Sequence, residues 1–166
     1  MPTSAMPRFV VDANVGRLAK WLRALGYDTI FDKDIDDDTL IRIGLSQGRV
    51  LLTRDTRILE RRVVTTGQLT AILVQDDDVF GQLKQVVGTL NLDSRNQRFS
   101  LCLVCNEPLI PVPKEEVHGE VPPYVFKTQS TFCRCPSCRK VYWQGTHWER
   151  MKAQLEKVQG EGVVSG

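Results

Sequence analysis

The sequence has no apolar run approaching the roughly 20 residues that cross a lipid bilayer, so we expect no membrane-spanning helix. Its opening residues, Met1 to Arg8, lack the apolar segment of a secretory signal peptide. Net charge is also low, at +2 over 166 residues, so a nucleic-acid partner would have to be recognised by local charge. These absences favour a soluble, cytoplasmic protein.

Cysteine is absent before residue 102, and aspartate is absent after residue 93. This change in composition indicates two modules. The polar segment 93–98 between them shows no hydrophobic periodicity, which is typical of a junction. We expect an N-terminal domain over 1–95, a zinc-binding module over 99–150, and a terminal helix with a disordered tail over 151–166.

Strand-like and helix-like segments alternate through the first module. Short apolar runs predict strands, and apolar residues at helical spacing predict helices. The predicted strands cover 9–11, 28–31, 50–53 and 69–74, and the predicted helices cover 15–25, 37–47, a segment beginning near Asp55, and 80–90. This alternation favours an α/β fold, in which helices flank a parallel sheet on both faces.

Aspartates gather where the predicted strands end. Asp12 ends the first strand and Asp55 lies just past the third. Others follow the second and fourth strands: Asp34, Asp36, Asp37, Asp38, Asp76, Asp77 and Asp78. Ligands of open parallel sheets bind at this carboxyl edge. Carboxylates repel one another there unless a cation such as Mg²⁺ or Mn²⁺ neutralises them. Such an ion polarises a phosphodiester and lowers the pKa of an attacking water, which is the chemistry of phosphodiester hydrolysis.

Other roles for these acids stay open. Aspartates also cap helices and stabilise turns. Capping accounts well for six of those after the second and fourth strands: Asp34, Asp36, Asp38, Asp76, Asp77 and Asp78. Asp12 and Asp55 are harder to explain as capping residues, because each follows an apolar strand, where an unpartnered carboxylate is costly. A phosphotransfer domain with Asp12 as acceptor is a weaker alternative, since Asn14 stands where such phosphatases have a second acid.

Basic residues flank the candidate site on the first and third predicted helices. They are Arg17, Lys20, Arg23, Arg54 and Arg57, with Arg61 and Arg62 nearby. Contacts of this kind hold a phosphate backbone without reading its sequence. The same residues would also suit an ordinary solvated helix face.

Four cysteines of the second module form two pairs, each with two residues between its members. Cys102 and Cys105 make the first pair, and Cys135 and Cys138 the second. Two such knuckles complete a closed tetrahedral site, which predicts a structural zinc ion with no open position for catalysis. The proline-rich spacer between the pairs predicts an inserted loop or hairpin.

Three further features of this module leave alternatives. Cys133 would allow a shifted set of ligands, although Cys135 preserves the spacing in both pairs. His118 and His147 are not needed once four cysteines ligate the ion. The aromatic segment 141–148, followed by Met151 and other apolar residues at helical spacing, favours core packing of the last helix. Base stacking is the second interpretation of its aromatic side chains.

Three segments resemble one known family. The runs 9–28, 48–55 and 135–148 are similar, in the same order, to the PIN-like ribonuclease domains named after the C-terminal region of the Mut-seven exonuclease. The resemblance covers about residues 8 to 152. It implies a PIN-like domain over 1–95 fused to a zinc ribbon, and a metal-dependent ribonuclease that uses Mg²⁺ or Mn²⁺.

The resemblance also assigns positions. Asp12 and Asp55 match the family's strand-end acids, and Asp37 matches the acid that opens the intervening helix, with Asp36 or Asp38 as substitutes under a shift of one residue. Asp76 or Asp77 is expected to assist through a water. A further acid on the first helix is missing here. A non-catalytic RNA-binding module therefore remains the alternative.

Overall fold

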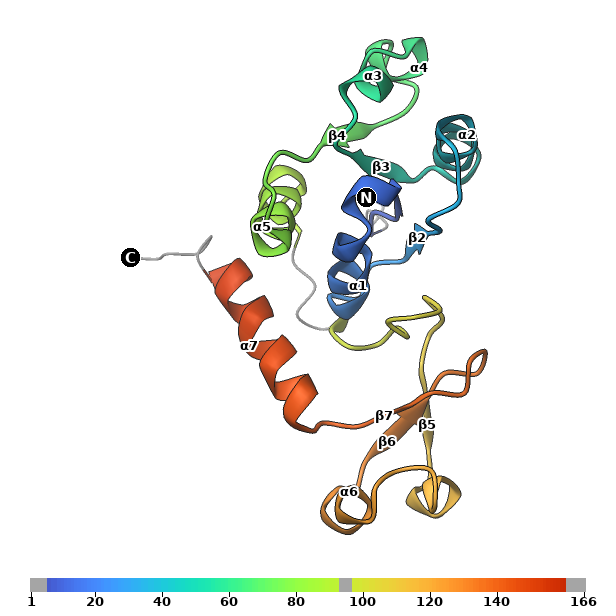
Figure 1. Ribbon diagram of the computed structural model, residues 1–166, viewed down its shortest axis with the longest axis vertical. Coiled ribbons are helices and arrows are strands. Elements are labelled where there is room, and N and C mark those ends of the chain that lie inside the picture. The colour runs from blue at the N-terminus through green and yellow to red at the C-terminus, as the bar shows by residue number, and fades with distance from the viewer. Residues whose placement is uncertain (1–5, 93–96, 161–166) are drawn as a thin grey trace, which may run out of the picture.

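A computed structural model describes residues 6–92 and 97–160. The predicted disordered tail lies outside these residues from 161 onward, and so does most of the predicted junction, at 93–96. Figure 1 shows a larger upper part around one sheet and a smaller lower part around a second sheet, with the last helix running between them. None of the described helices is both long and apolar enough to span a membrane.

The larger part is built on a parallel sheet of four strands in the order β2-β1-β3-β4. The strands are β1 (Phe9–Val11), β2 (Thr29–Phe31), β3 (Val50–Thr53) and β4 (Ala71–Leu73). In this register Val11 lies opposite Phe31 on one side and Leu52 on the other. The α/β fold class predicted from the sequence is confirmed.

Helices cover both faces of this sheet because side chains alternate along each strand. The elements between and after the strands are η1 (Ala13–Val15), α1 (Arg17–Ala24), α2 (Asp37–Gln47), α3 (Thr56–Leu59), α4 (Arg62–Thr65) and α5 (Val79–Leu90). The helix predicted near Asp55 is thus a pair of short helices. Phe9 and Val11 pack on one face, with α1 and α5, and Val10 packs on the other, with α2 and α3.

The smaller part holds an antiparallel sheet of three strands in the order β5-β6-β7. Its elements are β5 (Ile110–Val112), η3 (Lys114–Val117), α6 (Pro123–Thr128), β6 (Phe132–Arg134) and β7 (Val141–Tyr142). Val117, Val121, Val125 and Phe132 form a small core of their own. The spacer predicted as an inserted loop or hairpin therefore contains two antiparallel strands, β5 and β6, with two short helical segments between them.

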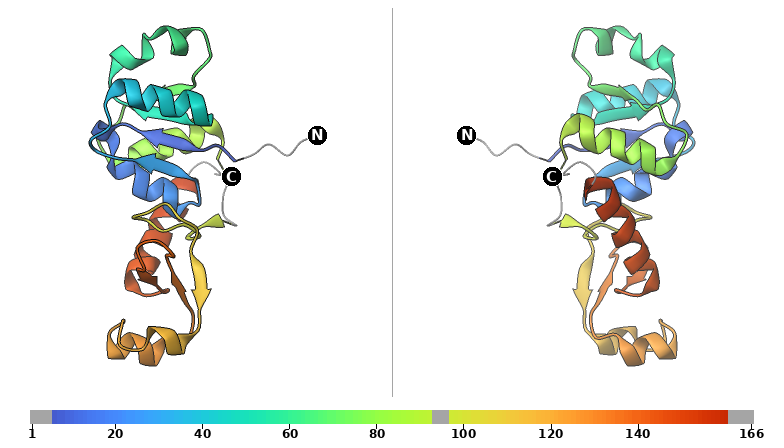
Figure 2. Two further views of the ribbon diagram at one scale, coloured as in Figure 1. Left: turned by 90° about the vertical axis from the view of Figure 1, so that its right-hand side faces the viewer. Right: turned by 90° about the vertical axis from the view of Figure 1, so that its left-hand side faces the viewer.

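The last helix, α7 (Thr146–Gly160), returns to the larger part. Met151, Leu155 and Val158 are buried in the same hydrophobic cluster as Leu18 and Leu83, and both views in Figure 2 place α7 on the α1 and α5 side of the sheet. The core role predicted for this apolar stripe is confirmed. The predicted boundary between the zinc-binding module and the terminal helix was at residue 151, whereas α7 begins at Thr146.

The first zinc knuckle docks onto the amino edge of the parallel sheet, where α1 ends and β2 begins. The Asn106 side chain accepts a hydrogen bond from the Thr29 N–H at 2.9 Å and donates one to Asp28. Gly26 allows the close approach of residue 97, because its φ is +97° and a Cβ there would lie 2.4 Å from the Gln97 carbonyl oxygen. At this edge the two modules are therefore held together by the Asn106 side chain and by the close approach of residue 97.

Candidate functional site

Three aspartates lie at the carboxyl edge of the parallel sheet, on adjacent strands. Asp12 follows β1 directly, Asp55 follows β3, and Asp37 opens α2 after β2. Because β1 lies between β2 and β3, Asp12 is the central one of the three. This edge is opposite the one to which the zinc knuckle docks.

Asp12 is buried and fixed in place, with only 8% of its surface exposed. One carboxylate oxygen accepts from the Ala13 N–H at 2.8 Å, and the other accepts from the Thr53 hydroxyl at 2.6 Å. The Thr53 hydroxyl oxygen in turn accepts from the Asp55 N–H at 2.9 Å. Thr53, which sequence reasoning missed, thus links two of the predicted site acids. A hydroxyl residue ending a buried strand next to an acid was the available signal.

The three candidates for the α2 acid have different partners. Asp36 caps the helix by accepting from the Thr39 N–H, and Asp38 forms an ion pair with Arg61. Burial raises the pKa of Asp37, and so do the negative charges of Asp12 and Asp55. Asp37 therefore interacts electrostatically with the other two site acids.

Asp55 has a different environment. Hydrogen bonds from the Arg57 side chain, and then from its N–H, hold the pKa of Asp55 below its usual range. The guanidinium contacts both carboxylate oxygens at 3.2 Å. The Arg57 side chain is 84% exposed, and such surface ion pairs contribute little. Arg57 can therefore leave Asp55 at low cost when another cation or a phosphate competes.

These acids are close but do not form a closed cage. Among the described residues, the four cysteines are the only group of three or more Cys, His, Asp or Glu whose candidate ligand atoms all lie within 4.8 Å. An open arrangement still suits Mg²⁺, which usually keeps several waters and takes only one or two carboxylates. The donor set at the edge therefore fits a hydrated hard cation, not a soft or fully enclosed one.

A hollow of about 550 Å³ lies beside this edge. Asn14, Arg17, Arg54 and Asp77 contribute to its lining. Arg54 forms an ion pair with Asp77 at 2.7 Å, and the Arg54 N–H donates to the Asn14 side chain. The hollow combines cationic side chains with open space beside η1, the segment that directly follows Asp12. Cationic side chains of this kind can hold a phosphate backbone.

The acids after β4 have mainly local roles. Asp78 caps α5 by accepting from two backbone N–H groups, and Asp76 accepts from the Asp78 N–H. The capping interpretation thus holds for both. Asp77 remains at the surface, paired with Arg54.

The five predicted phosphate contacts occupy different surroundings. Arg17, Lys20, Arg54 and Arg57 are exposed. Arg23 is 7% exposed and donates to the backbone oxygens of Thr29, Leu103 and Val104. A phosphate contact for Arg23 is therefore wrong, because its guanidinium is enclosed between β2 and the first zinc knuckle.

Replacing Arg23 with methionine is expected to lower the free energy of unfolding by about 3 kcal/mol, because buried carbonyl oxygens lose a charged donor. Urea denaturation measures the change. Arg17→Met is the matched control, because Arg17 is an exposed arginine on another face of the same helix. Its free energy of unfolding should stay within about 0.5 kcal/mol of the wild type. Equal stability of both variants would contradict the structural role of Arg23.

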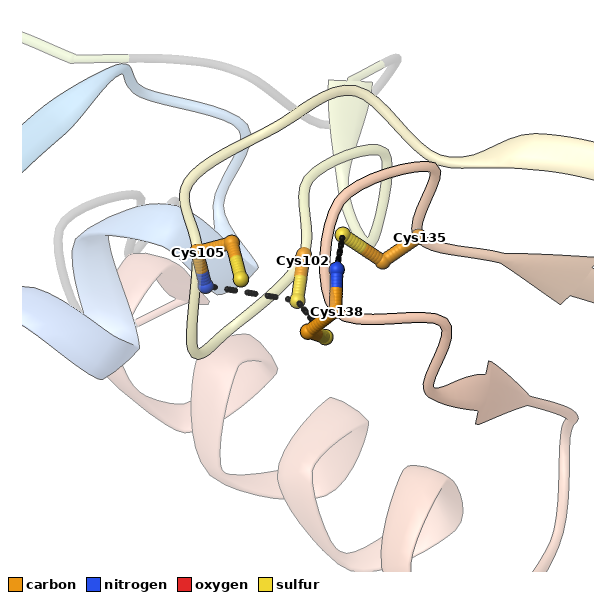
Figure 3. A group of neighbouring side chains, drawn as sticks. All are labelled: Cys102, Cys105, Cys135 and Cys138. Atoms are coloured by element: carbon orange, nitrogen blue, oxygen red, sulfur yellow. Dashed lines mark hydrogen bonds between the residues drawn. The ribbon is translucent and has the colours of Figure 1, made fainter.

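The zinc-site prediction concerns the four paired cysteines, which the structure brings together (Figure 3). The sulfurs of Cys102 and Cys138 lie 3.8 Å apart, which agrees with the ~3.8 Å that tetrahedral Zn–S bonds of ~2.3 Å require. Backbone N–H groups of Cys105 and Cys138 donate to the sulfurs of Cys102 and Cys135. Cys133 lies in β6 and is not part of the cluster.

Ionisation of the thiols supports the same conclusion. Burial opposes ionisation of Cys102, but the Tyr142 hydroxyl and backbone N–H groups outweigh it and lower the pKa to about 7. Hydrogen bonding to Cys138, and then burial, raises the pKa of Cys105. One thiolate therefore forms readily and the next resists ionisation, as expected where several sulfurs share one site without a cation. The cluster fits a structural zinc ion.

Comparison with known families decides the identity. The model of the family described as "Mut7-C RNAse domain" matches residues 7–155. This chain belongs to the Mut7-C RNAse domain family. The match spans both the parallel sheet and the cysteine cluster, so the resemblance noted from three short segments is confirmed. Comparisons of this Mut7-C domain with curated proteins and with solved structures give no match.

Proposed function

We propose that this Mut7-C domain is a metal-dependent ribonuclease in which Asp12, Asp37 and Asp55 hold Mg²⁺ or Mn²⁺. The observation that carries the proposal is the position of the three acids after adjacent strands at one edge of the sheet, where Thr53 links Asp12 to Asp55. Burial raises the pKa of Asp37 there, and so do the negative charges of Asp12 and Asp55. A bound cation would relieve this repulsion. The family name indicates a nuclease, and the paired cysteines suit a reducing cytoplasm.

Each residue has a definite part in this proposal. When bound, the ion would polarise the phosphodiester and lower the pKa of the attacking water. Thr53 keeps Asp12 oriented toward the edge. Arg17 and Arg54 line the adjoining hollow and would hold the RNA backbone. Arg57 would exchange its contact with Asp55 for a phosphate.

A second candidate function rests on a specific feature. Helix α1 carries no acid, although the family pattern places a further one on this helix, and Arg57 occupies both oxygens of Asp55. Both features favour a module that binds RNA without cutting it. Metal-dependent turnover distinguishes the two functions.

The test is incubation of the zinc-loaded protein with labelled single-stranded RNA, with and without added Mn²⁺. The wild type should cleave only with the ion. Asp55→Asn should lower the rate by at least about 100-fold, because a ligand charge and the charge stabilisation it supports are lost.

The result separates three cases. Cleavage that needs both Mn²⁺ and Asp55 supports the ribonuclease. Intact RNA that still shifts in a gel supports the binding module. Full activity of Asp55→Asn, or cleavage without a divalent ion, would contradict the proposed centre.

A further inference from the structure

A second hollow, of about 650 Å³, lies where the small sheet meets the start of α7. Its volume is typical of pockets that take ligand-sized groups. Aromatic rings dominate its wall: Tyr124, Tyr142, Trp143 and Trp148, with Phe99 behind them. Tyr124 is 73% exposed, so its ring is accessible to a ligand that enters the hollow.

The two tryptophans are held in fixed positions. Trp148 packs against Phe99 with the ring centroids 5.3 Å apart, and Trp143 packs against Phe132 at 6.4 Å. Both tryptophans also line an adjoining apolar hollow, and both keep part of their surface exposed. Rings that are supported on one side and open on the other offer stacking surfaces at low entropic cost.

Positive charge surrounds these rings. The Lys140 ammonium lies 5.5 Å from the Tyr142 ring centroid, and that of Lys152 lies 5.2 Å from the Trp148 ring centroid. Burial lowers the pKa of His147 in the wall, and so do the charges of Lys20, Lys140 and Arg150. Among the described residues lining the hollow, Glu149 is the one acid. The site thus combines aromatic faces with cations.

Helix α1 connects this hollow to the aspartate edge. Arg17, at the start of α1, lines the first hollow, at the aspartate edge, together with Asn14 and Arg54. Lys20 follows about one turn later on the exposed surface. Met151, which lines the second hollow, packs in the same hydrophobic cluster as Leu18 and Leu22 of α1. A backbone carrying regularly spaced phosphates can therefore follow exposed cations from one site to the other.

We propose that the aromatic hollow stacks unpaired bases of a single-stranded RNA whose backbone runs along α1 from the aspartate edge. The proposal rests on the proposed ribonuclease in taking RNA as the ligand. Alternating cations and exposed rings form the arrangement that proteins use for single strands without sequence preference. Duplex RNA does not fit, because its bases are stacked within the helix.

The experiment measures binding of the zinc-loaded, full-length protein to a labelled oligouridylate of about 12 nucleotides, without Mg²⁺ or Mn²⁺. Fluorescence anisotropy is compared with that for an abasic strand of equal length. Tyr124→Ala and Trp148→Ala should each weaken oligouridylate binding about tenfold and leave abasic binding unchanged. Tyr124→Phe should bind like the wild type.

Leu45→Ala is the matched control, because this exposed residue lies on α2, across the sheet from α1. Tyr124 is exposed, so its variants test the proposal even if Trp148→Ala folds poorly. Unchanged oligouridylate binding of Tyr124→Ala, or an equal loss on the abasic strand, would overturn the stacking role. The two proposals can fail separately. If the variants show these binding differences but the wild type does not cleave RNA with Mn²⁺, the ribonuclease proposal is wrong and the stacking site is still supported.

Discussion

Cys135→Ser is expected to abolish zinc binding and to lower the free energy of unfolding by about 5 kcal/mol or more. Zinc binding to four-thiolate sites contributes directly to folding, with apparent values of about 10–16 kcal/mol in small peptides. Cys135 is fully buried, and its sulfur accepts from the N–H groups of Ser137 and Cys138. Native mass spectrometry gives the metal content, and thermal denaturation gives the stability.

Cys133→Ser is the matched control for this prediction, two residues away on the same segment. Cys133 is partly buried in β6, outside the cluster, so its variant should retain zinc and lose no more than about 1 kcal/mol. If Cys133→Ser loses zinc and Cys135→Ser keeps it, the alternative set of ligands is correct.

Loss of zinc through Cys135→Ser should also loosen the first knuckle, because all four cysteines share one site, and the effect should reach the larger module. Arg23 and Asn106 tie the backbone and side chains of this knuckle to α1 and β2, so the free energy of zinc binding also supports the amino edge of the parallel sheet. Cys135→Ser is therefore expected to lower the melting temperature of the whole chain. A single transition by circular dichroism and by tryptophan fluorescence would show this.

Asp12→Asn should lower metal-dependent RNA cleavage by about 1000-fold or more while leaving the fold nearly intact. The proposed centre loses its central charge, which no neighbouring residue replaces. Asparagine keeps one acceptor for the Ala13 N–H, and its amide can donate to the Thr53 oxygen. The cost in stability should therefore be about 1–2 kcal/mol, as measured by urea denaturation beside the cleavage assay.

Asp38→Asn is the matched control for Asp12→Asn, since Asp38 lies beside the site acids but pairs with Arg61 at the surface. It should change neither cleavage nor stability appreciably. Equal activity of the Asp12 and Asp38 variants would remove Asp12 from the centre. Loss of activity in both would favour the register shifted by one residue along α2.

The local pattern of residues was enough to predict most of the elements of the parallel sheet. Its central strands are buried on both faces, so they are continuous apolar runs such as Phe9–Val11 and Val50–Thr53. The bounds of α2 follow from local chemistry, since Asp36 caps its start and Gly48 ends it in the left-handed conformation. The cysteine spacing predicted the metal cluster for a similar reason, because each knuckle is a local turn.

Other features depended on residues far apart in the chain. Arg23 has the spacing of a solvated helix residue, yet its side chain is buried and donates to the Leu103 carbonyl, 80 positions away. The link from Thr53 to Asp12 spans 41 positions, and Asp37 is distinguished from its neighbours by its burial and by the charges of Asp12 and Asp55.

The last helix shows the physical reason most clearly. Periodicity in α7 predicted that Met151, Leu155 and Val158 share one buried face, because side chains repeat along a helix in a fixed way. It could not say whether that face packs on the ribbon or on the parallel sheet, since either apolar surface would bury it equally well. The packing of α7 beside α1 and α5 is a property of the assembled core.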